Sequence, residues 1–92
     1  MNKKLTVLTP RENVAYCVLS PEKDYEKQLE ELFDIHGHGL CVVFDGKTVK
    51  VRDYFCDETM GTFEVLSFED CEDEVVLSWQ NLENSIEKET LE

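Results

Sequence analysis

Carboxylates are the residues in this chain whose types and spacing could carry a specific chemistry. An acidic residue recurs every fourth position at Glu22, Glu26, Glu30 and Asp34. With a rise of about 1.5 Å per residue, a helix would place successive members of this row about 6 Å apart on one winding ridge. Like charges at this spacing destabilise a helix by about 0.2–0.5 kcal/mol per pair, so helix stability does not explain the row. An ordinary solvated helix face is the competing interpretation.

A second and denser group of carboxylates occupies the last third of the chain. Residues 57–92 contain 12 acidic residues and one basic residue, whereas residues 1–56 contain 9 acidic and 8 basic residues. Alternate residues of a strand stand about 6.6 Å apart on one face. Successive phosphates of one DNA strand have a similar separation through space, because they are about 3.4 Å apart along the axis and further apart around the cylinder. We expect two groups of carboxylates to imitate phosphates. The first is the row Glu22, Glu26, Glu30 and Asp34, and the second consists of Glu64, Glu69, Asp70, Glu72, Asp73, Glu74, Glu83 and Glu87.

The net charge of −12 restricts the class of partner. A field of this sign repels nucleic acid and anionic lipid and attracts basic protein surfaces, so we expect a cationic protein partner and no direct contact with nucleic acid or membrane. Two other uses of the acidic residues compete with this one. Acidic surfaces promote solubility. Acidic loops also bind calcium, but residues 69–74 lack the central glycine and distal glutamate of a calcium loop.

Other reactive side chains give weaker signals. His36, His38 and Cys41 could hold a soft metal ion, but a fourth ligand is missing nearby, and histidines at a helix end also interact favourably with its negative pole. The four cysteines form no close pair in the sequence. This spacing favours the interpretation that they are small apolar residues of a protein in a reducing cytosol, and not zinc ligands or a redox pair. The chain has no glycine-rich phosphate loop and no serine elbow. We therefore expect no enzyme activity, no catalytic or metal-ligating residues and no cofactor.

The expected architecture is one acidic domain, residues 1–92, of the α+β class: a mostly antiparallel sheet of five to six short strands with one main helix packed on it. Ser20 and Pro21 predict the start of that helix, which should run over about 21–36 and bury Tyr25, Leu29, Leu32, Phe33 and His36. Gly37 or Gly39 should end it. A short C-terminal helix should follow Asn81, which would cap it.

Alternating and continuous apolar runs predict the strands, and turn residues predict the connections. In residues 14–19 both faces are apolar, which suits a central strand. Asp45 and Gly46 are the strongest hairpin signal in the chain. The expected strands are 5–8, 14–19, 40–44, 47–54, 63–68 and 75–79, with a loop at 57–61 and the acidic run 69–74 joining the last two strands. No apolar run is long enough to cross a bilayer and no secretion signal is evident, so a cytoplasmic protein is expected.

In length, acidity and the placement of its acidic residues, the chain resembles the Arn-like family of small anti-restriction proteins of T-even coliphages, which are DNA mimics. The resemblance covers the whole chain and is carried by the Glu22 to Asp34 row and the run 69–74, without a diagnostic motif. It implies a phage counter-defence protein in the host bacterial cytosol that blocks a restriction nuclease such as McrBC. It also implies homodimers with a longer acidic face, and nucleoid-associated proteins as a second class of target. The alternative is an acidic adaptor that binds through an apolar patch or a sheet edge.

Overall fold

The computed structural model describes residues 1–35, 39–53 and 59–81. They form one helix, α1 (Tyr25–Phe33), and one six-stranded sheet. The strands are β1 (Asn2–Leu8), β2 (Val14–Leu19), β3 (Leu40–Phe44), β4 (Thr48–Asp53), β5 (Thr59–Cys71) and β6 (Val76–Asn81). Their order in the sheet is β3-β4-β5-β1-β2-β6, and every pairing is antiparallel. The α+β class and the six antiparallel strands are therefore confirmed.

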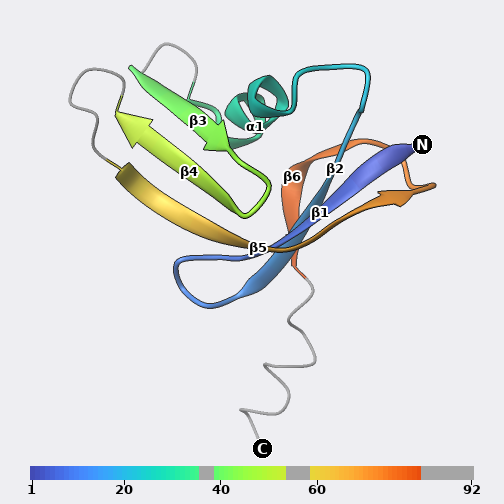
Figure 1. The fold of residues 1–92 in the computed structure, drawn as a ribbon, viewed down its shortest axis with the longest axis horizontal. Coiled ribbons are helices and arrows are strands. Elements are labelled where there is room, and N and C mark those ends of the chain that lie inside the picture. Colours follow the sequence, from blue (N-terminus) through green and yellow to red (C-terminus); the bar gives the residue numbers. More distant parts are fainter. Residues whose placement is uncertain (36–38, 54–58, 82–92) are drawn as a thin grey trace, which may run out of the picture.

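The sheet is curled, and α1 lies in the hollow of its concave face (Figure 1). The helix packs against both edge strands, β3 and β6, and so connects the two edges of the sheet. The apolar core fills the space between helix and sheet and consists of Leu5, Val7, Cys17, Leu19, Leu29, Ile35, Val42 and Val49. Six aromatic rings pack around it, from Tyr25, Phe33, Phe44, Phe63, Phe68 and Trp79.

Strand β2 has the predicted central position. It lies between β1 and β6, and Ala15, Cys17 and Leu19 point into the hollow. Val18, on the opposite face, is also buried at 1% exposure between its register partners Lys4 and Val76. Both faces of β2 therefore carry buried apolar side chains, which matches the apolar pattern of its sequence.

The predicted hairpin between β3 and β4 is also confirmed. Gly46 has a φ of 91°, a backbone conformation that glycine adopts without strain. The Asp45 carboxylate accepts hydrogen bonds at 2.8 Å from the backbone N–H groups of Lys47 and Thr48. These bonds lower the pKa of Asp45 because they stabilise its ionised form. Neighbouring residues thus supply the side-chain bonds of the turn, and Val65 N of β5 adds a bond to its Lys47 carbonyl.

The predicted start of the helix is wrong by four residues. The cap is Asp24, whose side chain accepts a hydrogen bond from Lys27 N at 3.2 Å. Ser20 belongs to a preceding turn, in which its hydroxyl accepts from Glu22 N. The buried side chain of Gln28 holds that turn, since its Oε1 accepts from Ser20 N and its Nε2 donates to Ser20 O, both at 2.8 Å.

The predicted end of the helix is also too late. The helix stops at Phe33, and Asp34 forms the C-cap with a left-handed φ of 55°. Asp34 N donates to the carbonyls of Glu30 and Glu31, which satisfies groups that the helix end would otherwise leave unpaired. Tyr25, Leu29, Leu32 and Phe33 pack in the core as expected. His36 and Gly37 lie outside the described residues.

Strand β5 is much longer than predicted. It includes residues 59–61, which were expected in a loop, and residues 69–71, which were expected in a connection. Pairing explains the difference, because β5 has β4 along its first half and β1 along its second half. Asn81, the expected cap of a C-terminal helix, is the last residue of β6. The rest of that predicted helix lies outside the described residues.

Candidate functional site: an acidic corner

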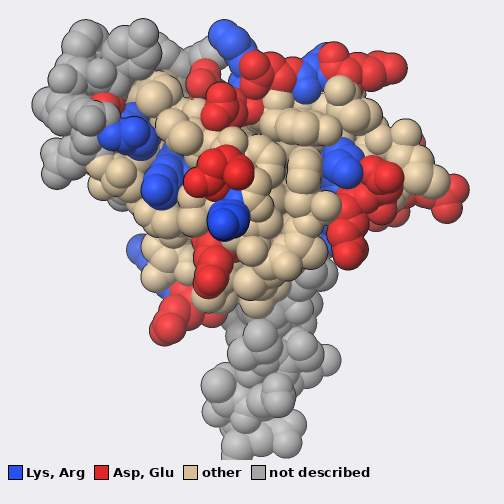
Figure 2. All heavy atoms as spheres, viewed as in Figure 1, with Lys and Arg blue, Asp and Glu red and all other residues tan. Residues whose placement is uncertain are grey.

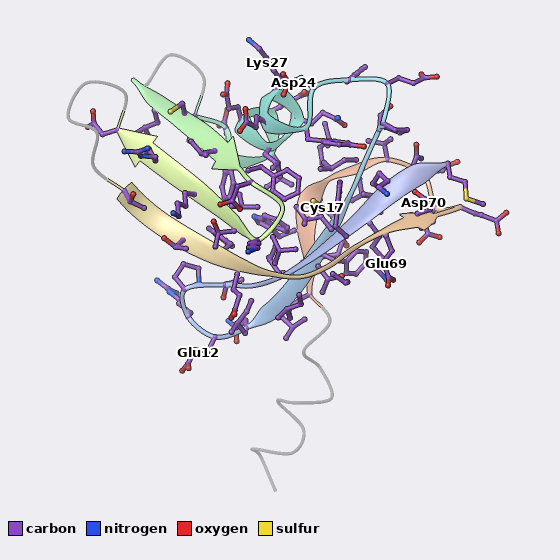
Figure 3. All side chains as sticks on the ribbon, viewed as in Figure 1. Glu12, Cys17, Asp24, Lys27, Glu69 and Asp70 are labelled. Atoms are coloured by element: carbon purple, nitrogen blue, oxygen red, sulfur yellow. The ribbon has the colours of Figure 1, made fainter. Side chains whose placement is uncertain are left out.

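Five exposed carboxylates gather where β5 ends and turns toward β6. We call this group the acidic corner; its members are Glu69, Asp70, Glu72, Asp73 and Glu74. Figure 3 shows Glu69 and Asp70 at this end of β5, well away from Glu12 in the β1–β2 turn and from Asp24 at the start of the helix. The acidic residues of the described chain therefore lie in several separate places, and the acidic corner is the densest group.

The start of β1 holds the backbone of the acidic corner in place. Lys3 lies opposite Asp70 in the antiparallel register and Lys4 lies opposite Glu69. Asn2 Nδ2 donates a hydrogen bond of 2.8 Å to the carbonyl of Asp73, which ties the turn to β1. The carboxylates thus project from a paired strand and an anchored turn.

The same pairing brings two cations to the acidic corner that the sequence analysis did not place there. Lys3 Nζ lies 2.8 Å from Asp70 Oδ1 and 5.0 Å from the centre of the Phe68 ring. This hydrogen-bonded contact lowers the pKa of Asp70 and raises that of Lys3. Lys4 Nζ instead lies over the Tyr16 ring, 4.4 Å from its centre.

The ion pair leaves most of the acidic corner uncompensated. The Asp70 side chain is 63% exposed, so the pair contributes little to stability. Within the described part of the chain, Glu69, Glu72, Asp73 and Glu74 have no ion-pair partner. Figure 2 shows acidic side chains gathered at this end of the molecule, beside basic ones, whereas acidic and basic side chains alternate elsewhere on the same face.

The predicted row along the helix does not form a ridge. Glu22 precedes the helix and Asp34 follows it as the left-handed cap. Glu26 is half-buried, and its carboxylate accepts a hydrogen bond of 2.8 Å from the backbone N–H of Phe44 in β3. Glu30 is half-buried as well. The expectation of four equivalent surface carboxylates on one helix is therefore wrong, since helix bounds and tertiary contacts separate them.

The remaining predicted phosphate mimics, Glu64, Glu83 and Glu87, do not belong to the acidic corner. Glu64 is exposed on β5 and pairs with Leu8 on one side and Thr48 on the other. It lies on the same strand as the acidic corner, several residues nearer the middle of the sheet. Glu83 and Glu87 lie outside the described residues. The contribution of the last eleven residues to the acidic surface therefore stays a prediction.

The alternative reactive groups gain no geometric support. His36 and His38 lie outside the described residues, and Cys41 is half-buried in β3. The described residues include no group of three His, Cys, Asp or Glu side chains that could hold a metal ion, and they line no pocket. Cys17 is fully buried, and desolvation raises the pKa of its thiol to about 12. The part of the chain that the structure describes includes no helix long and apolar enough to span a bilayer.

Comparison with protein-family models, with curated proteins and with solved structures finds no match to this chain.

Proposed function

We propose that this chain is a non-catalytic DNA mimic that inhibits a basic DNA-binding protein by occupying its DNA-binding surface with the acidic corner. A host restriction nuclease such as McrBC, or a nucleoid-associated protein, is the class of target, and phage counter-defence is the biological role. The observation that carries the proposal is a dense group of exposed and largely uncompensated carboxylates on a fixed backbone.

The charge density of the acidic corner supports this proposal. Five carboxylates occur within residues 69–74. Six residues span about 20 Å when fully extended. Residues 72–74 lie in a turn, so the run is shorter than this and carries at least about one negative charge per 4 Å. One strand of duplex DNA carries a phosphate about every 3.4 Å along the axis. A cationic groove shaped for a phosphate row therefore meets a similar density of charge at the acidic corner.

Rigidity supports the proposal for a second reason. A disordered acidic tail loses conformational entropy when it binds, whereas groups on a paired strand are already ordered. Glu69 and Asp70 lie in the ladder between β5 and β1, and Asn2 anchors the turn at Asp73. The acidic corner therefore presents its backbone in a fixed arrangement before it meets a partner.

The alternative function, an acidic adaptor, could bind its partner at a sheet edge or through an apolar patch, and the edge mode has little support. Binding by strand addition needs an open sheet edge with free backbone groups. The two edge strands, β3 and β6, both pack against α1, and the Phe44 amide of β3 is occupied by Glu26. The other version, an apolar patch, has support from Leu66, which is 50% exposed.

The proposal is tested by capture of partners from bacterial lysate on the immobilised chain, with and without competing duplex DNA. A triple variant, Glu72→Gln, Asp73→Asn and Glu74→Gln, neutralises the unpaired turn. We expect the wild-type chain to retain basic DNA-binding proteins that duplex DNA displaces, and the triple variant to lose them.

A charge-matched control separates the acidic corner from net charge. Glu12→Gln, Glu22→Gln and Glu31→Gln remove three exposed carboxylates elsewhere on the chain. This control should retain the partners that the acidic-corner variant loses. Equal capture by both variants, or partners that duplex DNA does not displace, would contradict the proposal.

A further inference from the structure

A β-bulge holds one leucine on the surface of the sheet, close to the acidic corner. Between β1 and β5 the register shifts, because Thr6 pairs with Ser67 while Val7 pairs with Val65. Leu66 is the extra residue and is 50% exposed. Counting back from the inward-facing Phe68, Leu66 would point into the core, so the bulge is what leaves it outside. Bulges of this kind re-aim side chains and are common beside functional sites.

Leu66 shares the convex face of the sheet with three further apolar residues, which lie on β1 and β2. Leu8 in β1 pairs with Val14 in β2, and both lie on the face opposite the core residues Leu5 and Val7. Tyr16, the ring under Lys4, lies on the same face of β2. All three are half-buried, so the strip is partly open to solvent. We call Leu66, Leu8, Val14 and Tyr16 the outer strip.

Carboxylates border Leu66 on its own strand. Glu64 precedes it by two residues and Glu69 follows it by three, which corresponds to about 7 Å and 10 Å along a strand. Both are exposed, and neither is ion-paired within the described residues. A partner that fits this arrangement carries cations on both sides of an apolar side chain.

We propose that the outer strip and its bordering carboxylates bind a cationic partner segment that carries large apolar side chains between its lysines or arginines. This inference rests on the proposed function, because the same partner contacts the acidic corner. It adds an apolar contact that a phosphate row does not offer, so partner recognition has a component that salt does not screen. Leu66 is its central residue.

Two fluorescein-labelled peptides of equal length and equal lysine content test the inference by fluorescence anisotropy. One has leucines between its lysines and the other has serines. At physiological ionic strength we expect wild-type protein to bind the leucine peptide about tenfold more tightly, which corresponds to about 1.4 kcal/mol. Leu66→Ser should remove most of this difference and Leu66→Met should keep it. Val75→Ser, at an exposed apolar residue outside the outer strip, should leave it unchanged.

The outcomes separate this inference from the proposed function. Equal affinity of wild-type protein for the two peptides, or no effect of Leu66→Ser, overturns the apolar contact but leaves the acidic corner as a binding site. Failure of both peptides to bind even at low salt overturns the proposed function and this inference together.

Discussion

The hydrogen bond between Glu26 and β3 gives the most specific prediction about the acidic residues. If Glu26 is a structural residue rather than a phosphate mimic, then Glu26→Ala should destabilise the fold. The carboxylate accepts from Phe44 N at 2.8 Å in a half-buried position. Hydrogen bonds to charged groups contribute about 1.5–3 kcal/mol, so we expect a loss of about 2 kcal/mol.

Urea unfolding followed by fluorescence of Trp79, the chain's single tryptophan, measures this loss. Trp79 stacks on Phe63 with 5.6 Å between ring centres, so its emission reports on core packing. With a denaturant slope of about 1 kcal/mol per molar urea, the unfolding midpoint should fall by about 2 M. Glu26→Gln keeps a neutral acceptor and should lose less.

The matched control is Glu31→Ala on the same helix, because Glu31 is exposed and its side chain has no hydrogen-bond partner among residues 1–35, 39–53 and 59–81. It should change the free energy of unfolding by less than about 0.5 kcal/mol. Hydrogen exchange gives a local test, since the Phe44 amide should lose protection only in the Glu26 variants. Equal midpoints for Glu26→Ala and Glu31→Ala would refute a structural role for Glu26.

Two further predictions concern the buried polar and titratable groups. Gln28→Leu removes both hydrogen bonds to the Ser20 backbone. The unsatisfied backbone groups should destabilise the fold by about 2–4 kcal/mol in the same urea assay. An unchanged midpoint would contradict the role of Gln28 in holding the turn at Ser20. Burial raises the pKa of Cys17 from its ordinary value of 9.0 to about 12. Above about pH 9 the unfolded chain therefore releases a proton that the folded chain retains. The free energy of unfolding should fall as pH rises, because deprotonation favours the unfolded chain. Between about pH 8 and pH 10 this decline should be about 1.4 kcal/mol, and it should be missing from the pH profile of Cys17→Ala. Parallel profiles for the two proteins would contradict the prediction.

The features that sequence predicts well here are those decided by neighbouring residues. The hairpin at Asp45 and Gly46 depends on one left-handed glycine and one side chain that bonds its own turn. The alternation in β2 places Ala15, Cys17 and Leu19 on the core face. Each signal is contained in a short segment, so it can be recognised without knowledge of the tertiary structure.

Distant contacts explain the errors at the helix. Ser20 and Pro21 are good starting residues, but the buried amide of Gln28 holds Ser20 in a turn, and Asp24 caps the helix instead. Nothing local distinguishes Glu26, which bonds to β3, from other carboxylates of the row. Only the tertiary structure shows that the fourfold spacing is not a surface ridge.

The acidic corner was predicted in part. The run 69–74 was identified correctly as a dense exposed group, because residues so rich in charge stay in solvent. Its cations were missed, since Lys3 and Lys4 are more than sixty positions away in sequence and come to lie opposite Asp70 and Glu69 only through the β1–β5 register. The bulge at Leu66 was also missed, because the shift is defined by two strands together.

The salt dependence of binding to a DNA-displaced partner tests the central claim most directly. Dissociation constants should be measured by titration from low to physiological ionic strength, for wild-type protein and for the Glu72→Gln, Asp73→Asn, Glu74→Gln variant. Phosphate-like contacts predict that affinity falls by about tenfold or more over this range, and that the variant binds more weakly with a shallower slope. An affinity that stays constant with salt, or an identical slope for the variant, would contradict the account.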